Sequence, residues 1–451
     1  MGKYFGTDGF RGEANCNLTV DHAFKIGRFM GYYLKKTIDR PRVAIGKDTR
    51  RSSYMFESAL CAGLTASGAD AHILHVTTTP SVSYIVRADD FDLGIMITAS
   101  HNPFQDNGIK LINSNGDKME ESTLLELEKY LDSDEEVPYA YGSEIGRTVD
   151  YEEGRNRYAA HLISIATRSY NNYRVGLDCA NGSSWEMAKR IFDSLGADTF
   201  VVGNKPDGLN VNVNCGSTHI ENLVKLVKEN HLDVGFAFDG DADRCIAVDE
   251  KGNIVNGDHI MYVCARYMQE TETLRDSKVV TTVMSNMGLY KALDELGIGY
   301  EKTLVGDKYV AENMRENGHL IGGEQSGHII FGRLANTGDG ILTAIKLMEV
   351  ITETKIPLSK LAEPMIMYPQ VLKNVVVTDK DETLNCAEVK DCIEKVEKDL
   401  GEDGRVLVRK SGTEPLLRVM VEATTIELCE EKVDEIIESM NQAGKLIEIK
   451  K

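Results

Sequence analysis

Long apolar runs are absent from this sequence, which excludes a membrane-spanning helix. No stretch approaches the ~18 consecutive apolar residues that a helix needs to cross a bilayer. The first residues, MGKYFGTDG, also lack the apolar segment of a secretory signal, and Gly6 stands where N-myristoylation requires Ser or Thr. The nine cysteines are odd in number and form no C-x-x-C pair. We therefore expect reduced thiols and a cytoplasmic protein.

Basic residues are in deficit, with 51 Lys and Arg against 71 Asp and Glu and a net charge of −20. A field of this sign repels nucleic acid and anionic membrane surfaces, so we expect neither as a partner. It does not exclude a small anionic substrate, because a local cluster of arginines can still bind a phosphate.

Three segments share one pattern, an apolar run followed by a polar loop and then a helical spacing of apolar residues. They begin at Val43, Val175 and Val279. Such strand-then-helix units predict an α/β protein that binds ligands at the loops after its strands. From residue 371 onward, strand-like runs alternate with helical patterns near 383–400 and 426–440, which predicts a smaller α+β domain. The length of 451 residues gives about three domains as a first expectation.

The most specific local pattern is the run of acidic residues Asp239, Asp241 and Asp243, followed by Arg244. Three carboxylates at every second position repel one another unless a cation lies between them, and hard oxygen ligands suit Mg²⁺ or Ca²⁺. An EF-hand would also place Glu250 correctly, but it requires Gly where Arg244 stands, and its flanks should be helical rather than strand-like. We predict a metal-binding hairpin loop; a solvated acidic turn is the alternative.

A second pattern is Thr98-Ala-Ser100-His101-Asn-Pro103, a polar loop directly after an apolar strand. Ser100 could act there as a nucleophile, although the loop is not the G-x-S-x-G elbow of the α/β-hydrolases. His101 adds little by itself, since adjacent residues at a strand end point apart. Taken alone, the pattern also fits an ordinary loop serine.

Three further loops combine glycines with polar or basic side chains. G-G-E-Q-S-G-H can present groups to sugar hydroxyls, R-K-S-G-T-E-P can bind phosphate without the Walker spacing, and F-G-T-D-G-F-R-G can place one guanidinium. A structural turn is the alternative for each. The side chains in question are Glu324, Gln325, Ser326 and His328; Arg409, Ser411, Gly412, Thr413 and the nearby Arg418; and Arg11.

Together, and in this order along the chain, these loops resemble the signature loops of the α-D-phosphohexomutase family. The resemblance runs from Phe5 to Arg418. It implies four domains rather than three: related α/β domains with mixed sheets at 1–150, 151–253 and 254–368, and a smaller α+β domain at 369–451. The active site would lie in a central cleft among them.

The resemblance also implies an activity. The sequence around Gln325 is similar to that of the family members that interconvert glucosamine 6-phosphate and glucosamine 1-phosphate, on the route to UDP-N-acetylglucosamine and cell wall. Ser100 would carry a phosphoryl group, and a hexose 1,6-bisphosphate would serve as intermediate and activator. The alternatives are a mutase of glucose or mannose phosphates, and a non-catalytic sugar-phosphate sensor. A homodimer through the first domain is expected for this family.

Residue roles follow from the same resemblance. The side chains implied are Ser100, Asp239, Asp241 and Asp243 for Mg²⁺; Glu324, Gln325 and Ser326 for the sugar; Arg409, Ser411, Gly412, Thr413 and Arg418 for the non-reacting phosphate; and Arg244 as a further site residue. We expect Lys110 to be the general acid/base, with its pKa lowered by neighbouring arginines. His101 and His328 are the alternatives, and Arg11 would stabilise developing charge.

Overall fold

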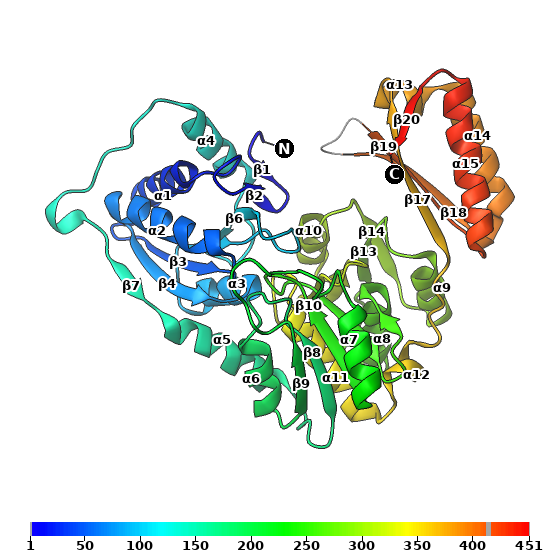
Figure 1. Cartoon of the computed structure of the whole chain (residues 1–451), viewed down its shortest axis with the longest axis horizontal. Coiled ribbons are helices and arrows are strands. Elements are labelled where there is room, and N and C mark those ends of the chain that lie inside the picture. The colour runs from blue at the N-terminus through cyan, green and yellow to red at the C-terminus, as the bar shows by residue number, and fades with distance from the viewer. Residues whose placement is uncertain (1, 412–415, 451) are drawn as a thin grey trace. The chain divides into compact units, whose positions relative to one another are not determined.

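The computed structural model describes residues 2–411 and 416–450, and it divides into two compact units (Figure 1). The first unit runs to Met284 and resumes from Gly297 to Pro364. The second joins Ser285–Leu296 to the chain from Met365 onward. Among the described residues, no helix combines the length and apolarity needed to span a bilayer.

The first sheet has seven strands in the order β1-β2-β6-β5-β3-β4-β7 and is mixed: β4, β3 and β5 are parallel, whereas β6 and β2 run antiparallel to their neighbours. Helices α1 and α2 pack closely, since a Cβ on Gly27 would lie 2.6 Å from the carbonyl oxygen of Leu60. The bounds are β1 Phe5–Gly6, β2 Gly9–Glu13, α1 Val20–Lys35, β3 Arg42–Lys47, α2 Arg51–Ala66, β4 Asp70–Val76, α3 Thr79–Ala88, β5 Leu93–Ile97, β6 Asp106–Asn113, α4 Glu121–Asp132, a 3₁₀ turn Gly142–Glu144 and β7 Thr148–Asp150.

The second sheet has the order β12-β11-β10-β8-β9, with β9, β8 and β10 parallel and β11 and β12 antiparallel. Its strands are almost wholly apolar where they are buried on both faces, as in Val234–Phe238. The bounds are α5 Glu152–Ile165, β8 Arg174–Asp178, α6 Met187–Ser194, β9 Asp198–Val202, α7 Glu221–Asn230, β10 Val234–Phe238, β11 Cys245–Asp249 and β12 Ile254–Val255.

The third sheet has the order β14-β13-β15-β16, with only β16 antiparallel. The predicted α/β architecture with mixed sheets is therefore confirmed. The bounds are α8 Gly257–Glu270, β13 Val279–Thr282, α9 Met287–Glu295, β14 Tyr300–Thr303, α10 Asp307–Asn317, β15 Ile321–Gly323, β16 Ile329–Phe331, α11 Gly340–Thr354 and α12 Leu358–Ala362. Of these, α9 belongs to the second compact unit.

The fourth sheet is antiparallel throughout, in the order β18-β19-β17-β20, and α14 and α15 bury their apolar faces with it in one core. The predicted α+β tail is confirmed, with two differences: the helix expected at 383–400 is broken at Cys386, whose backbone is extended, and a last strand was not foreseen. The bounds are β17 Gln370–Val377, α13 Lys380–Asn385, α14 Ala387–Leu400, a 3₁₀ turn Gly401–Asp403, β18 Arg405–Lys410, β19 Leu416–Glu422, α15 Ile426–Gln442 and β20 Leu446–Lys450.

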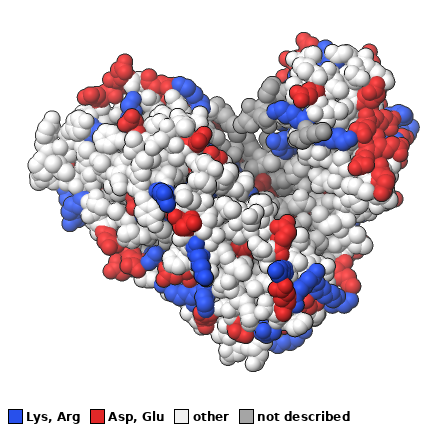
Figure 2. Space-filling model, viewed as in Figure 1, with Lys and Arg blue, Asp and Glu red and all other residues white. Residues whose placement is uncertain are grey.

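Charge is unevenly distributed over the surface. Figure 2 shows carboxylates gathered over the C-terminal helices α14 and α15, while both signs are scattered over the first unit.

All nine cysteines are unpaired. The predicted boundaries of the four domains stay a prediction, because the two compact units do not divide the first three.

Candidate active site

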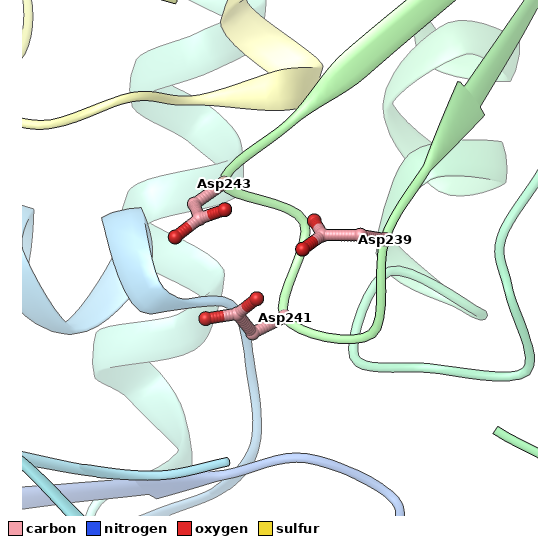
Figure 3. Close-up of side chains that lie close together, drawn as sticks. All are labelled: Asp239, Asp241 and Asp243. Carbon is pink, nitrogen blue, oxygen red and sulfur yellow. The ribbon is translucent and has the colours of Figure 1, made fainter. Parts of the chain in front are cut away.

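The three aspartates lie in the turn of the β10–β11 hairpin and point toward one another (Figure 3). Asp239, Asp241 and Asp243 are all buried and can each offer one oxygen within 4.8 Å of the others. Burial raises the pKa of Asp239 well above its usual range, and the neighbouring carboxylates of Asp243 and Asp241 raise it further. The predicted hairpin loop is therefore present.

The donor set fits a hard divalent cation. Oδ1 of Asp241 and Oδ1 of Asp243 are buried and make no hydrogen bond within the described part of the chain. A buried carboxylate oxygen without a partner is costly, and a bound cation would remove that cost. Six oxygen ligands are typical of Mg²⁺ and six to eight of Ca²⁺, so these carboxylates suit either ion.

Ser100 lies beside this loop although it is 139 residues away from Asp239 in the chain. Its Oγ donates to Oδ2 of Asp239 at 2.5 Å, and its backbone N–H donates to Oγ1 of Thr98 at 2.9 Å. The side chain is buried, and its backbone adopts a left-handed conformation with φ of 52°. The structure thus brings the candidate nucleophile and the acidic loop together.

Lys110, on β6, contacts the same loop at Asp241 and Asp243. Its Nζ lies 2.7 Å from Asp241 and 3.2 Å from Asp243. Burial alone would lower the pKa of Lys110, but the carboxylates of Asp241, Asp243 and Asp8 outweigh it and raise the pKa above the ordinary value. The expectation that arginines would lower this pKa is wrong in this structure, because the nearest charges are carboxylates.

The two histidines occupy different surroundings. Nδ1 of His101 lies 3.4 Å from Oγ of Ser100, and burial, reinforced by Arg244 and Arg11, lowers the pKa of His101 to about 4. Its ring is therefore neutral near pH 7.

His328 lies between two carboxylates. Nδ1 is 3.7 Å from Asp243 and Nε2 is 3.7 Å from Asp307. Burial lowers the pKa of His328, and the carboxylates of Asp243 and Asp307 oppose that effect. The backbone N–H of Gly338 nevertheless donates to Nε2 at 2.9 Å, which requires an unprotonated nitrogen. We therefore take the ring as neutral, with its proton on Nδ1 toward Asp243.

Two arginines complete this part of the site. The backbone N–H of Arg244 donates to Asp239 at 3.2 Å; burial lowers the pKa of its guanidinium, but Asp239 and Asp243 outweigh that effect and raise it. Arg11, on β2, lies 3.2 Å from Asp8. Nε of both arginines is buried and makes no hydrogen bond among the described residues. Both guanidinium groups can therefore receive an anion.

The loop between β15 and β16 packs against the β10–β11 hairpin. The backbone N–H of Cys245 donates to the carbonyl oxygen of Gly327, and a Cβ on Gly327 would lie 2.3 Å from the carbonyl oxygen of Cys245. Glu324 and Gln325 are half-buried, and Ser326 is exposed. Glu324 accepts the backbone N–H of Gly306 at 3.1 Å and the hydroxyl of Ser326 at 3.4 Å.

The second unit carries the candidate phosphate-binding residues. Arg409 on β18 and Arg418 on β19 are directly opposite each other, and like charges in that register destabilise a sheet unless an anion lies between them. Burial, with Arg418 beside it, lowers the pKa of Arg409. The backbone N–H of Ser411 donates to Leu416. The predicted Gly412 and Thr413 lie outside the described residues.

Sequence reasoning missed several residues that contact this site. Thr79 donates its hydroxyl to Asp241 at 2.5 Å, and Lys118 links Asp8 to Asp307 at 3.1 and 2.7 Å. Arg50 donates through Nη2 to the carbonyl oxygen of Ser100 at 2.9 Å. It follows a strand at the edge where ligands bind, which was the one signal that could have singled it out.

The four domain models of the phosphoglucomutase/phosphomannomutase family match this chain in order. Domain I matches residues 2–138, domain II 156–252, domain III 256–368 and the C-terminal domain 372–439. The chain belongs to this family, and it is a mutase, an enzyme of the isomerase class.

Among curated relatives, the chain is 62% identical to a protein of Lachnospira eligens named phosphoglucosamine mutase, over 98% of this chain and 99% of the relative. It is 59% identical to the phosphoglucosamine mutase of Lachnoclostridium phytofermentans, over 99% and 100%.

Solved structures with the same fold include a phosphoglucomutase/phosphomannomutase family protein of Burkholderia thailandensis, with a TM-score of 0.80 and 22% identity over 98% of both chains. An N-acetylglucosamine-phosphate mutase matches with a TM-score of 0.65 and 19% identity, over 96% of this chain and 95% of its own.

Proposed function

We propose that this enzyme is a phosphoglucosamine mutase, which interconverts glucosamine 6-phosphate and glucosamine 1-phosphate. The observation that carries the proposal is the 2.5 Å contact between Oγ of Ser100 and Asp239, which sets a nucleophile against a three-carboxylate loop. The relatives named phosphoglucosamine mutase, at 51–62% identity, support this choice of substrate.

In the proposed reaction, Ser100 carries a phosphoryl group. A substrate hydroxyl attacks the phosphorus, the bond to Oγ breaks, and a 1,6-bisphosphate forms while the hydroxyl proton leaves to a base. The bisphosphate then turns around. Oγ of Ser100 attacks its other phosphate and releases the isomeric monophosphate. Asp239, Asp241 and Asp243 would hold Mg²⁺, which neutralises charge on a phosphoryl group during its transfer.

The other side chains bind and orient. Arg11 and Arg244 offer guanidinium groups to phosphoryl oxygens, and Glu324, Gln325 and Ser326 are proposed to meet the sugar. Arg409, Ser411 and Arg418, with Gly412 and Thr413, are proposed to hold the phosphate that does not react. Lys110 is proposed to donate a proton to the departing oxygen and to accept one in the reverse direction. The bisphosphate activator, the homodimer and the cytoplasmic location stay predictions.

The test compares turnover of glucosamine 6-phosphate, glucose 1-phosphate and mannose 1-phosphate, with Mg²⁺ and a trace of hexose 1,6-bisphosphate. We expect a large kcat/KM preference for the amino sugar and no turnover by Ser100→Ala. Equal rates on all three substrates would reassign the enzyme to general hexose-phosphate metabolism. No turnover of any, by protein phosphorylated at Ser100, would indicate a sugar-phosphate sensor instead.

A further inference from the structure

The backbone at Ser100 is held in a conformation that serine rarely adopts. Its φ of 52° lies in the left-handed region, where a side chain with a Cβ is strained. Such a residue persists only when its surroundings fix it. The contacts that fix Ser100 therefore also determine where its Oγ points.

The first of these contacts is the guanidinium of Arg50, which is completely buried. Its Nη2 donates to the carbonyl oxygens of Ser100 at 2.9 Å and Asn102 at 2.8 Å. Its Nη1 donates to the carbonyl oxygen of Asp106 at 3.0 Å and to that of Pro103. One side chain thus binds four carbonyl groups around the loop that carries the nucleophile.

Asp48 balances the charge of Arg50 and fixes its orientation. Its carboxylate accepts Nε of Arg50 at 2.7 Å, the hydroxyl of Ser53 at 2.7 Å and the hydroxyl of Thr98 at 2.8 Å. Thr98 in turn accepts the backbone N–H of Ser100. Arg50 therefore binds the carbonyl oxygen of Ser100 directly and is linked to its N–H through Asp48 and Thr98.

The second contact comes from the loop between β9, a strand of the second sheet, and α7. Nδ2 of Asn212 donates to the carbonyl oxygens of Ser100 at 2.8 Å and Asn102 at 3.2 Å. Asn212 lies 112 residues from Ser100 and has a left-handed backbone of its own, with φ of 58°. In the turn between β10 and β11, a Cβ on Gly240 would lie 2.4 Å from the carbonyl oxygen of Ser100. The carbonyl oxygen of Ser100 is therefore enclosed by Arg50, Asn212 and Gly240.

We propose that Arg50 and Asn212 are positioning residues, which hold the carbonyl oxygen of Ser100 and thereby keep its Oγ directed at Asp239. The inference rests on the proposed mutase function and adds the device that aligns its nucleophile. Asn212 couples the loop after β5 to the second sheet, because its backbone N–H donates to the carbonyl oxygen of Ala180, just after β8, at 2.9 Å.

The reaction gives this device a purpose. Ser100 must give up a phosphoryl group and later attack the other end of the same intermediate, so its Oγ must occupy one place in both half-reactions. A misplacement of about 1 Å can cost a hundredfold in rate. Loss of a positioning contact should therefore lower kcat, while KM for the sugar phosphate, which the other loops bind, should stay nearly constant.

The experiment compares Asn212→Gly with Asn214→Gly. Glycine keeps the left-handed backbone at both positions, since φ is 58° at Asn212 and 51° at Asn214, but Asn214 is exposed on the surface. We expect Asn212→Gly to lower kcat by about ten- to a hundredfold with KM little changed, and to speed hydrogen exchange at residues 98–106. The control should match wild type in both measurements.

Two results would overturn the inference. One is a kcat of Asn212→Gly within about twofold of that of the control. The other is unchanged exchange at residues 98–106. The exchange measurement needs no substrate. If the wild-type enzyme had no mutase activity, the proposed function would be refuted, but hydrogen exchange at residues 98–106 would still test the positioning role of Asn212. Arg50→Lys, which keeps the charge but not the planar fork, should give the same kcat defect in protein shown to be folded by its circular dichroism.

Discussion

Removal of the carboxylate of Glu422 should strongly weaken the second compact unit. It is completely buried at the end of β19 and accepts Nε of Arg405 at 2.7 Å and Nη2 at 3.1 Å. It also accepts the backbone N–H of Met287 at 2.9 Å, at the start of α9, and Nδ2 of Asn286 at 3.3 Å. Truncation would remove this shared acceptor. Nδ2 of Asn286 and Nη2 of Arg405 would keep the carbonyl oxygens of Tyr368 and Ser285, whereas the backbone N–H of Met287 and Nε of Arg405 would lose the carboxylate.

The magnitude follows from those contacts. Removing one partner of a buried ion pair costs about 3–5 kcal/mol. The side chain of Arg405 is 20% exposed, which favours the lower end, about 3 kcal/mol. For a domain of 60–100 residues, each kcal/mol shifts Tm by roughly 4–8 °C, so Glu422→Ala should lower the Tm of this unit by roughly 12–24 °C. Glu422→Gln keeps the shape and should cost less, about 1–2 kcal/mol.

Differential scanning calorimetry of the full chain measures this effect, with Glu431→Ala as the control. Glu431 is exposed on α15, where a substitution should change stability by no more than about 0.5 kcal/mol. The reasoning is refuted if Glu422→Ala and Glu431→Ala have the same Tm, because the four hydrogen bonds would then contribute nothing to the folded state.

Three further predictions concern the first unit. Gly240→Ala should lower kcat by about tenfold or more, because its Cβ would lie 2.4 Å from a backbone oxygen, whereas Gly299→Ala, which meets only a flexible lysine side chain at 3.2 Å, should match wild type in a turnover assay. Asp239→Asn should raise the Mg²⁺ concentration for half-maximal turnover by about tenfold or more, measured by titration after chelation; an unchanged value would remove Asp239 from the metal site. Burial raises the pKa of Asp339 to about 6, so its proton stabilises the fold below pH 4 and that stability is lost as pH rises through 6. The Tm of Asp339→Asn relative to that of wild type should therefore increase as pH rises from 4 to 7. A Tm difference that stays constant over this pH range would contradict the raised pKa.

The features of this molecule that could be predicted are those determined by patterns within short stretches of consecutive residues. The D-x-D-x-D spacing predicts the hairpin loop at Asp239–Asp243, and the strand-loop-helix pattern predicts β3, β8 and β13 with their helices. Local spacing does not reveal a break such as that at Cys386, because the residues on both sides continue the helical pattern. The strand Leu446–Lys450 is short and largely exposed, so it carries little apolar signal.

The parts that could not be predicted depend on contacts between distant segments. Asn212 meets Ser100 only because two sheets place their loops together across 112 residues. The charge state of Lys110 was misjudged for the same reason: the sequence contains both arginines and aspartates, and only the fold shows that Asp241 and Asp243 are the closer partners.

The split of the second unit into Ser285–Leu296 and the chain from Met365 onward has a consequence for engineering. A chimaera that exchanges only the C-terminal residues with those of a relative would separate Glu422 from the N–H of Met287, and Tyr368 from Lys291. The exchanged module must be discontinuous, with the α9 segment transplanted together with the tail. By the same argument, a tail expressed alone should be stabilised by a synthetic α9 peptide added in trans.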